Sequence, residues 1–127
     1  MLDRVILEFT IDYFKANTNK KQPITNQKLD QVLQDGMGCR PFSEGGIRAL
    51  IHQIRVQCRI TDGNENVGWI CGNSDGYYLS YSALDILTHL TQFEGKIRKM
   101  MKVHKKGMEV LMNKMYYTQT ELEFKKD

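Results

Sequence analysis

The segment that decides the fold is 43–59, SEGGIRALIHQIRVQCR, near the middle of the chain. Its apolar residues recur at i, i+3, i+4, i+7 and i+11, namely Ile47, Leu50, Ile51, Ile54 and Cys58. That spacing places them on one face of an α-helix, which can then be buried. Ser43 comes directly before the pattern, and its hydroxyl can accept a hydrogen bond from an amide of the first turn. We therefore predict an amphipathic helix that begins after Ser43 and ends near Arg59.

A β-hairpin is predicted after this helix. Residues 67–71 (VGWIC) and 77–80 (YYLS) are rich in aromatic and β-branched residues, which favour strands. Between them, 72–76 (GNSDG) consists of residues typical of tight turns. The polar stretch 61–66 (TDGNEN) is predicted to be a loop that connects the helix to the hairpin.

Two further helices are predicted upstream. Residues 2–16 carry apolar side chains at helical spacing, and the polar stretch that ends at Pro23 interrupts the pattern. A short helix follows, with Thr25 or Asn26 as its N-cap, and Gly36 together with Gly38 is expected to end it.

A long helix is predicted from Ser82 to about Met115. Apolar residues and one histidine recur there every three or four positions: Leu90, Phe93, Ile97, Met101, His104, Met108, Leu111 and Met115. Such a helix spans about 50 Å, more than a small core can cover. We therefore expect a homodimer that packs through this helix. The polar stretch 118–127 is expected to be a flexible tail.

Length and composition exclude several classes of protein. The 127 residues, 41% hydrophobic and 26% charged, are typical of one globular domain. No apolar run is long enough to span a membrane, and the N-terminal residues lack a signal-peptide pattern, so we expect a cytoplasmic protein with no membrane partner. The three cysteines have no CxxC spacing, and no phosphate-binding loop or recognisable catalytic triad occurs. We expect no cofactor, no metal site and no enzymatic activity.

Charge is distributed unevenly along the chain. Residues 60–95 contain five acidic residues and no Lys or Arg, which gives −5. Residues 96–106 contain no acidic residue and six basic ones: Lys96, Arg98, Lys99, Lys102, Lys105 and Lys106. This basic run has two interpretations, a secondary patch that neutralises DNA phosphates or the solvated face of an amphipathic helix.

Two motifs and the order of the predicted elements resemble winged helix-turn-helix DNA-binding domains of the phage-encoded and biotin-repressor type. The motifs are 47–55 (IRALIHQIR) and 69–79 (WICGNSDGYYL), which are similar to the recognition helix and the wing of that family. The chain departs from the family in the insertion 61–67 and in Asp75, where such wings commonly carry Lys or Arg.

Together with the helices predicted on either side, the resemblance gives the expected fold: α+β and mainly α, a winged helix-turn-helix with a leading helix and a long C-terminal helix. The expected organisation is a winged helix in 1–80, a dimerisation helix in 81–117 and a tail in 118–127.

The resemblance also implies that the 43–59 helix reads the major groove of double-stranded DNA. The expected DNA-binding residues are Ser43, Glu44, Arg48, His52, Arg55, Arg59, Asn73 and Ser74. Arg48, His52, Arg55 and Arg59 follow at i, i+4, i+7 and i+11, as one stripe beside the buried face. The alternative is a solvated basic flank, or an Arg48 that pairs with an acidic residue of the same chain.

Two functions are consistent with these features. One is a DNA-binding transcriptional regulator or replication accessory factor of the phage or mobile-element type. The other is a winged helix that binds a protein partner without contacting DNA. Salt-dependent affinity for duplex DNA favours the first, and salt-insensitive association through the C-terminal helix favours the second.

Overall fold

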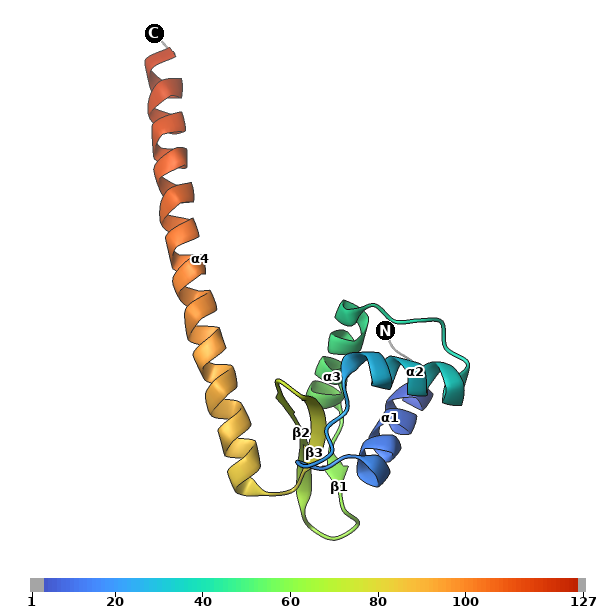
Figure 1. The fold of residues 1–127 in the computed structure, drawn as a ribbon. Coiled ribbons are helices and arrows are strands. Elements are labelled where there is room, and N and C mark those ends of the chain that lie inside the picture. Colours follow the sequence, from blue (N-terminus) through green and yellow to red (C-terminus); the bar gives the residue numbers. More distant parts are fainter. Residues whose placement is uncertain (1–3, 126–127) are drawn as a thin grey trace. The chain divides into compact units, whose positions relative to one another are not determined.

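The structure, a computed structural model, describes the backbone of residues 4–125 and the side chains of 4–116 other than Glu44. The described part is α+β and mostly helical, with four helices and one three-stranded antiparallel sheet (Figure 1). In chain order the elements are α1 (Arg4–Asn17), α2 (Asn26–Met37), α3 (Glu44–Gln57), β1 (Ile60–Thr61), β2 (Val67–Asn73), β3 (Gly76–Ser80) and α4 (Ala83–Lys125). The chain divides into two compact units, Met1–His89 and Leu90–Asp127.

The core of the first unit is formed by α1, α2, α3 and the sheet. Its fully buried side chains include Phe14, Leu29, Leu33, Ile47, Leu50, Ile51, Ile54 and Ile70. Four of these belong to the apolar face predicted for α3, so the prediction of a helix with one buried face is confirmed. Burial of each such side chain contributes roughly 1.5–3 kcal/mol, which holds α3 with its opposite face directed outward.

Side-chain caps define the starts of α2 and α3. The hydroxyls of Thr25 and Ser43 each accept a hydrogen bond from the amide three residues later, at 3.2 and 3.0 Å. Both predicted caps are confirmed, with Thr25 rather than Asn26 at the start of α2. Gly38 ends α2 with φ +64°, a left-handed conformation that glycine adopts without strain. The expectation that Gly36 also ends the helix is wrong, because α2 continues through it to Met37.

The predicted hairpin is confirmed, with a tighter turn than expected. β2 and β3 remain paired up to Asn73 and Gly76, which leaves two residues in the turn instead of five. The loop prediction for 61–66 is wrong at its first residue, because Thr61 belongs to β1 and pairs with Val67 of β2. The insertion therefore extends the sheet by one short strand.

A bridge joins the start of α2 to the hairpin. The amide of Ile24 donates to the carbonyl of Tyr77 at 2.7 Å, and the amide of Tyr77 donates back at 2.8 Å. The neighbouring Gly76 has φ +135°, and a Cβ atom on it would overlap the backbone of Ile24. The turn of the hairpin is thus shaped by the segment that precedes α2.

The first turns of α4 are held by the sheet within the first unit. The Ser80 hydroxyl donates to the carboxylate of Asp85 at 2.8 Å, and the Lys20 ammonium lies 3.2 Å from the same carboxylate. These two partners lower the pKa of Asp85 from its ordinary value, since both favour the charged form. The indole N–H of Trp69 donates to Nδ1 of His89 at 3.1 Å. Three side-chain contacts therefore hold residues 83–89 of α4 within the first unit.

α4 differs from its predicted bounds at both ends. It begins at Ala83 instead of Ser82 and continues to Lys125 instead of ending near Met115. Most of the stretch expected to be a flexible tail is therefore helical, while residues 126–127 lie outside the described part. Within that part, no helix is long and apolar enough to cross a membrane.

Candidate nucleic-acid interface

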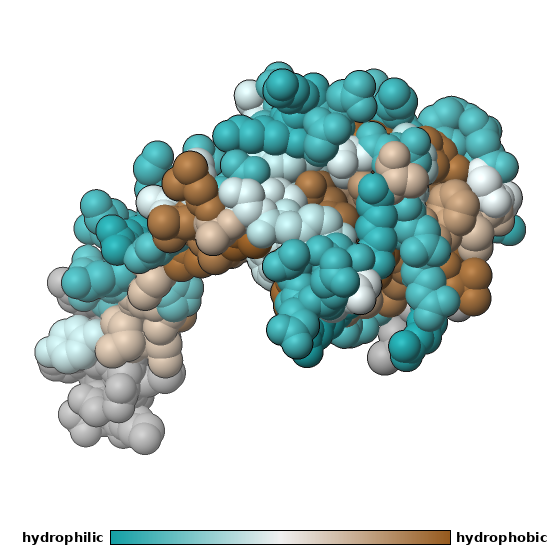
Figure 2. Space-filling model, turned by 90° about the horizontal axis from the view of Figure 1, so that it is seen from below, coloured by the Kyte–Doolittle hydropathy of each residue, from teal (hydrophilic) through white to brown (hydrophobic). Residues whose placement is uncertain are grey.

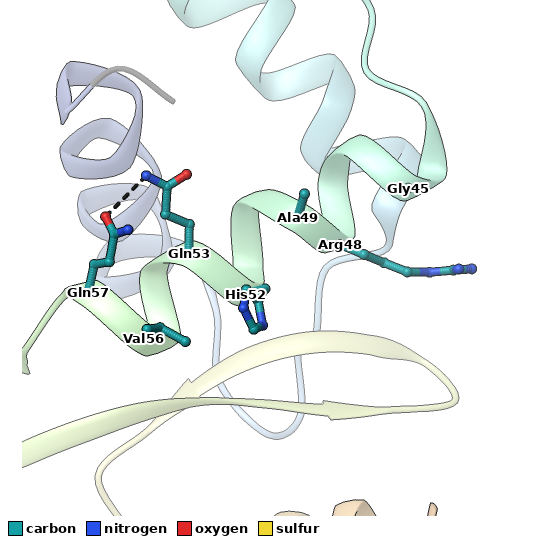
Figure 3. Close-up of a pocket in the computed structure, with 7 residues that line it drawn as sticks. All are labelled: Gly45, Arg48, Ala49, His52, Gln53, Val56 and Gln57. Carbon is teal, nitrogen blue, oxygen red and sulfur yellow. Dashed lines mark hydrogen bonds between the residues drawn. The ribbon is translucent and has the colours of Figure 1, made fainter. Parts of the chain in front are cut away.

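The outward face of α3 is the candidate site. Seven residues of this helix line a shallow surface hollow: Gly45, Arg48, Ala49, His52, Gln53, Val56 and Gln57 (Figure 3). They recur at helical spacing and lie on the outward side of α3, with Gln53 and Gln57 toward the edge of the buried face. Since every lining residue belongs to one helix, the feature is an exposed helix face and not an enclosed cavity.

The chemistry of this face combines small residues with long polar ones. Gly45 and Ala49 have small or no side chains, so the surface of α3 lies close to the helix axis near its start. A bulky side chain there would hold a large ligand away. Arg48 is exposed and, in Figure 3, extends away from the helix axis. Gln53 donates from Nε2 to the Oε1 of Gln57 at 3.1 Å, so the two amides form one pair on the surface. Arginine and amide side chains are the groups that contact the edges of guanine and adenine in the major groove.

Arg55 lies elsewhere, which corrects its expected role in DNA binding. It is half-buried, and its Nε and Nη2 both donate to the carbonyl oxygen of Ile70 in β2, at 3.0 and 2.7 Å. The guanidinium also lies over two rings, 5.7 Å from the centroid of Trp69 and 5.9 Å from that of Tyr77. Burial lowers its pKa from a very high ordinary value, and it stays charged. Arg55 therefore joins α3 to the sheet and is engaged within its own chain.

The other end of the predicted basic stripe is also displaced. α3 ends at Gln57, because Cys58 adopts an extended conformation with ψ 142°. Arg59 is exposed in the connection to β1 and is not part of the helical face. Of the four basic residues predicted to form one stripe, α3 therefore keeps Arg48 and His52 on its outward face.

Two predicted residues lie at the start of α3. The Ser43 hydroxyl is the helix cap, so it is occupied by the amide of Gly46. The backbone of Glu44 is helical, and its side chain lies outside the described part of the structure.

The tip of the β2–β3 hairpin carries Asn73 and Ser74, both exposed as a contact with a ligand would require. The side-chain oxygen of Asn73 accepts from the amide of Asp75 at 2.8 Å, which shapes the turn. Neither strand of the hairpin contains Lys or Arg.

The predicted secondary basic patch lies on α4 in the second unit. Lys96, Arg98, Lys99, Lys102, Lys105 and Lys106 are all exposed. Arg98 donates to Glu94 at 2.6 Å, and Lys106 lies 3.8 Å from Glu109, so two of the six have acidic neighbours one turn away.

Gln53, Gln57 and the small residues beside them make up most of the outward face, yet the sequence prediction of DNA-binding residues omitted both glutamines. The available signal was their spacing: Gln53 and Gln57 continue, at intervals of four residues, the row of the helix surface that begins with the small residues Gly45 and Ala49. The sequence prediction selected mainly charged residues and therefore omitted neutral amides. Glutamine side chains also hydrogen-bond base edges, those of adenine, as arginines do those of guanine.

Because comparisons with known proteins find no matching family model, curated protein or solved structure, the function has to be inferred from the chain's own residues. Among the described residues, no group of three or more His, Cys, Asp or Glu side chains is arranged to hold a metal ion.

Proposed function

We propose that the unit Met1–His89 is a winged helix-turn-helix domain that binds double-stranded DNA through the outward face of α3. The element order supports this proposal: a helix, an isolated strand-like residue, two helices and a hairpin follow one another. In a winged helix the second of the paired helices enters the major groove, and the hairpin lies beside it. α3 and the β2–β3 hairpin take these positions in the proposal.

The observation that carries the proposal is the division of α3 into two faces. One face is buried by Ile47, Leu50 and Ile54, which makes the helix a rigid part of the domain. The other exposes Arg48 and a glutamine pair beside small residues. A groove about 12 Å wide admits a helix, and small residues let the helix axis approach the bases.

The acidic surroundings set the expected strength of binding. Residues 60–95 have a net charge of −5, and the hairpin tip offers neutral Asn73 and Ser74 to phosphates instead of cations. Phosphate neutralisation is therefore modest, and we expect log K to fall with log salt with a slope of only about −2. Specific base contacts must contribute more of the affinity than in a strongly basic domain.

The test begins with selection of duplexes from a random library at low salt. The selected duplex is then titrated by fluorescence anisotropy between about 50 and 200 mM salt. Arg48→Ala and the double variant Gln53→Ala/Gln57→Ala are each expected to weaken specific binding by about 10-fold or more. Lys15→Ala on α1 is the matched control, because it removes one positive charge as Arg48→Ala does. It should leave the affinity within about 2-fold.

Failure would be recognisable in two ways. Selection that enriches no duplex, or variants of α3 that bind as tightly as the wild type, would contradict the proposal.

The resemblance to phage-type winged helices further suggests a transcriptional regulator or a replication accessory factor.

A second candidate function is favoured by the charge of the hairpin region. Because the hairpin carries no Lys or Arg, and because Asp62, Glu65 and Asp75 are exposed on it and on the loop before it, this surface suits a basic protein partner better than DNA. Under this alternative, the wild-type chain has no affinity for duplexes at any salt concentration, and Asp75→Lys weakens capture of a basic partner.

A further inference from the structure

The second unit presents a narrow apolar seam along α4. Side chains at alternating 4- and 3-residue intervals form it from Ile97 onward, and Leu90 lies one heptad earlier: Leu90, Ile97, Met101, His104, Met108, Leu111 and Met115. Even the better covered of them stay exposed, with Ile97 at 41%, Met108 at 42% and Leu111 at 48%. Figure 2 shows hydrophobic side chains along α4 beside hydrophilic ones. An exposed stripe of this length is expected to be covered by another chain.

We propose that a second copy covers the seam and forms a parallel, in-register, two-stranded coiled coil with it. The spacing from Ile97 to Met115 is that of the a and d positions of a heptad, with Met101, Met108 and Met115 at a. Ile97, His104 and Leu111 then take the d positions. Leu90 continues the series at d, while Glu94 at the intervening a position pairs with Arg98 in its own helix. This inference does not depend on the proposed DNA binding.

A hollow on the seam has the form that coiled-coil packing requires. It is lined along the seam by Ile97, Met101, His104 and Met108, with Met100 and Lys105 at its sides. In knobs-into-holes packing, a side chain of the partner helix enters a hole made by four residues of this kind. Methionines adapt their shape to such a knob, so the observed hollow can close around it.

The positions of the basic residues fit this arrangement. Lys96, Lys99, Lys102 and Lys106 fall at the b, c and f positions, which point away from a partner helix. The basic run is therefore the solvated face of the coil, the second of the two interpretations that the sequence allowed.

The flanking positions select the parallel orientation. In a parallel pair, the e position of one helix faces the g position of the other, so Lys105 lies beside Met100 of the other copy. Its aliphatic stem can cover that methionine while its ammonium reaches water. An antiparallel pair can also bury the layers from Ile97 to Met115. In that pair the e positions of the two helices face each other, so Lys105 of one copy lies beside Lys105 of the other. Like charges at that position disfavour the antiparallel form.

The size of the seam predicts a weak dimer. About 15 side chains per copy would be covered, fewer than the 20–30 of a standard interface. Methionine and histidine also specify packing less sharply than Leu and Ile do. We expect micromolar dissociation.

The first experiment measures mass on the full chain, without DNA, by sedimentation between about 1 and 500 µM. The wild type is expected to shift from 14.8 kDa toward twice that mass over this range. Met108→Glu, at an a position, should raise the dissociation constant at least about 10-fold, since it buries a charge in the seam. Lys106→Glu, two residues away at f, is the matched control and should leave the dissociation constant within about 3-fold.

The second experiment tests orientation by disulfide formation under mild oxidation. In the parallel pair Met101→Cys meets its own copy at an a layer, within the Cα separation of roughly 4.4–6.8 Å that a disulfide needs. Lys99→Cys at f should not cross-link above the background set by the wild type, which already holds Cys39, Cys58 and Cys71. Fluorescence of the single tryptophan, Trp69 in the first unit, checks that each variant remains folded.

Two results would overturn the inference. A wild type that stays monomeric at every concentration would exclude pairing of two copies through the seam. A dimer in which Met101→Cys cross-links no better than Lys99→Cys would exclude the parallel register. Neither result bears on DNA binding by α3, so the two proposals fail separately.

Discussion

At the scale of single residues, Arg55 illustrates how one side chain changes role once its neighbours are known. Its guanidinium makes two hydrogen bonds to one carbonyl and lies over two aromatic rings. Hydrogen bonds from a charged donor contribute roughly 1.5–3 kcal/mol each in partly buried settings. The residue therefore belongs to the stability of the domain.

Replacing Arg55 with Ala should lower the free energy of unfolding by about 2–3 kcal/mol, because the Ile70 carbonyl loses both donors. Urea denaturation followed by tryptophan fluorescence measures the change. Arg59→Ala removes the same side chain from an exposed connection and should alter stability by less than about 0.5 kcal/mol. Equal effects of the two substitutions would show that the Arg55 contacts carry no stability.

Asp85 is expected to make stability depend on acid. Its pKa is lowered in the folded state by the Ser80 hydroxyl and the Lys20 ammonium, so the folded chain binds this proton less readily than the unfolded chain. The contribution is complete above the unfolded pKa and is lost as the pH falls below it and through the lower, folded pKa.

Asp85→Asn should therefore reduce stability at neutral pH and flatten its decline with acid, as measured by thermal unfolding at successive pH values. Asp12→Asn, at an exposed site on α1, serves as the control and should keep the wild-type profile. An Asp85→Asn profile parallel to the wild type would contradict the assignment.

At the scale of elements, the hairpin and the start of α2 form one structure. The bridge between Ile24 and Tyr77 brings the backbone of Ile24 against Gly76. No L side chain fits there, for two reasons: the backbone has φ +135°, and a Cβ atom would overlap the Ile24 carbonyl.

Gly76→Ala is expected to destabilise the domain by at least about 2 kcal/mol, since strain and overlap add. Gly63→Ala is a matched control, because Gly63 also has a positive φ of +88° but a Cβ atom there meets nothing within 4 Å. That variant should lose only about 1 kcal/mol from backbone strain. Thermal unfolding compares the two, and similar losses would mean that the contact with Ile24 is unimportant.

The α4 seam predicts an unusual gain. A polar residue in the core of a coiled coil costs stability, and His104 would occupy a d layer of the proposed dimer. His104→Leu should lower the dissociation constant by about 10-fold or more, as measured by sedimentation. Lys102→Leu at b adds equal apolar surface off the seam, and an equal gain from it would contradict the heptad assignment.

At the scale of the whole molecule, two proposals combine. If the first unit reads one half-site and α4 pairs two copies, the dimer binds a duplex with two half-sites more tightly than one with a single half-site. Met108→Glu should remove this advantage, by about 10-fold or more, while leaving single half-site affinity unchanged. Anisotropy titration of the two duplexes tests the link, and an advantage that survives in the variant would contradict it.

Much of the first unit was predictable because its signals are local. The caps Thr25 and Ser43, the apolar spacing of α3 and the turn residues of the hairpin each act over a few residues. The pairing of Thr61 with Val67 was missed, because a strand of two residues has no period to recognise. The contact of Ile24 with Tyr77 joins positions far apart in the chain, which no local pattern encodes.

The sequence by itself determined that residues 43–59 make an amphipathic helix, because the periodicity of apolar side chains follows from helix geometry alone. It also determined the heptad spacing on α4. Only the tertiary structure separated Arg48 from Arg55. Seven residues apart, they share one side of the helix, and nothing in the spacing distinguishes them. The sheet packs near the C-terminal part of α3 and covers Arg55 there, while Arg48, two turns earlier, stays exposed.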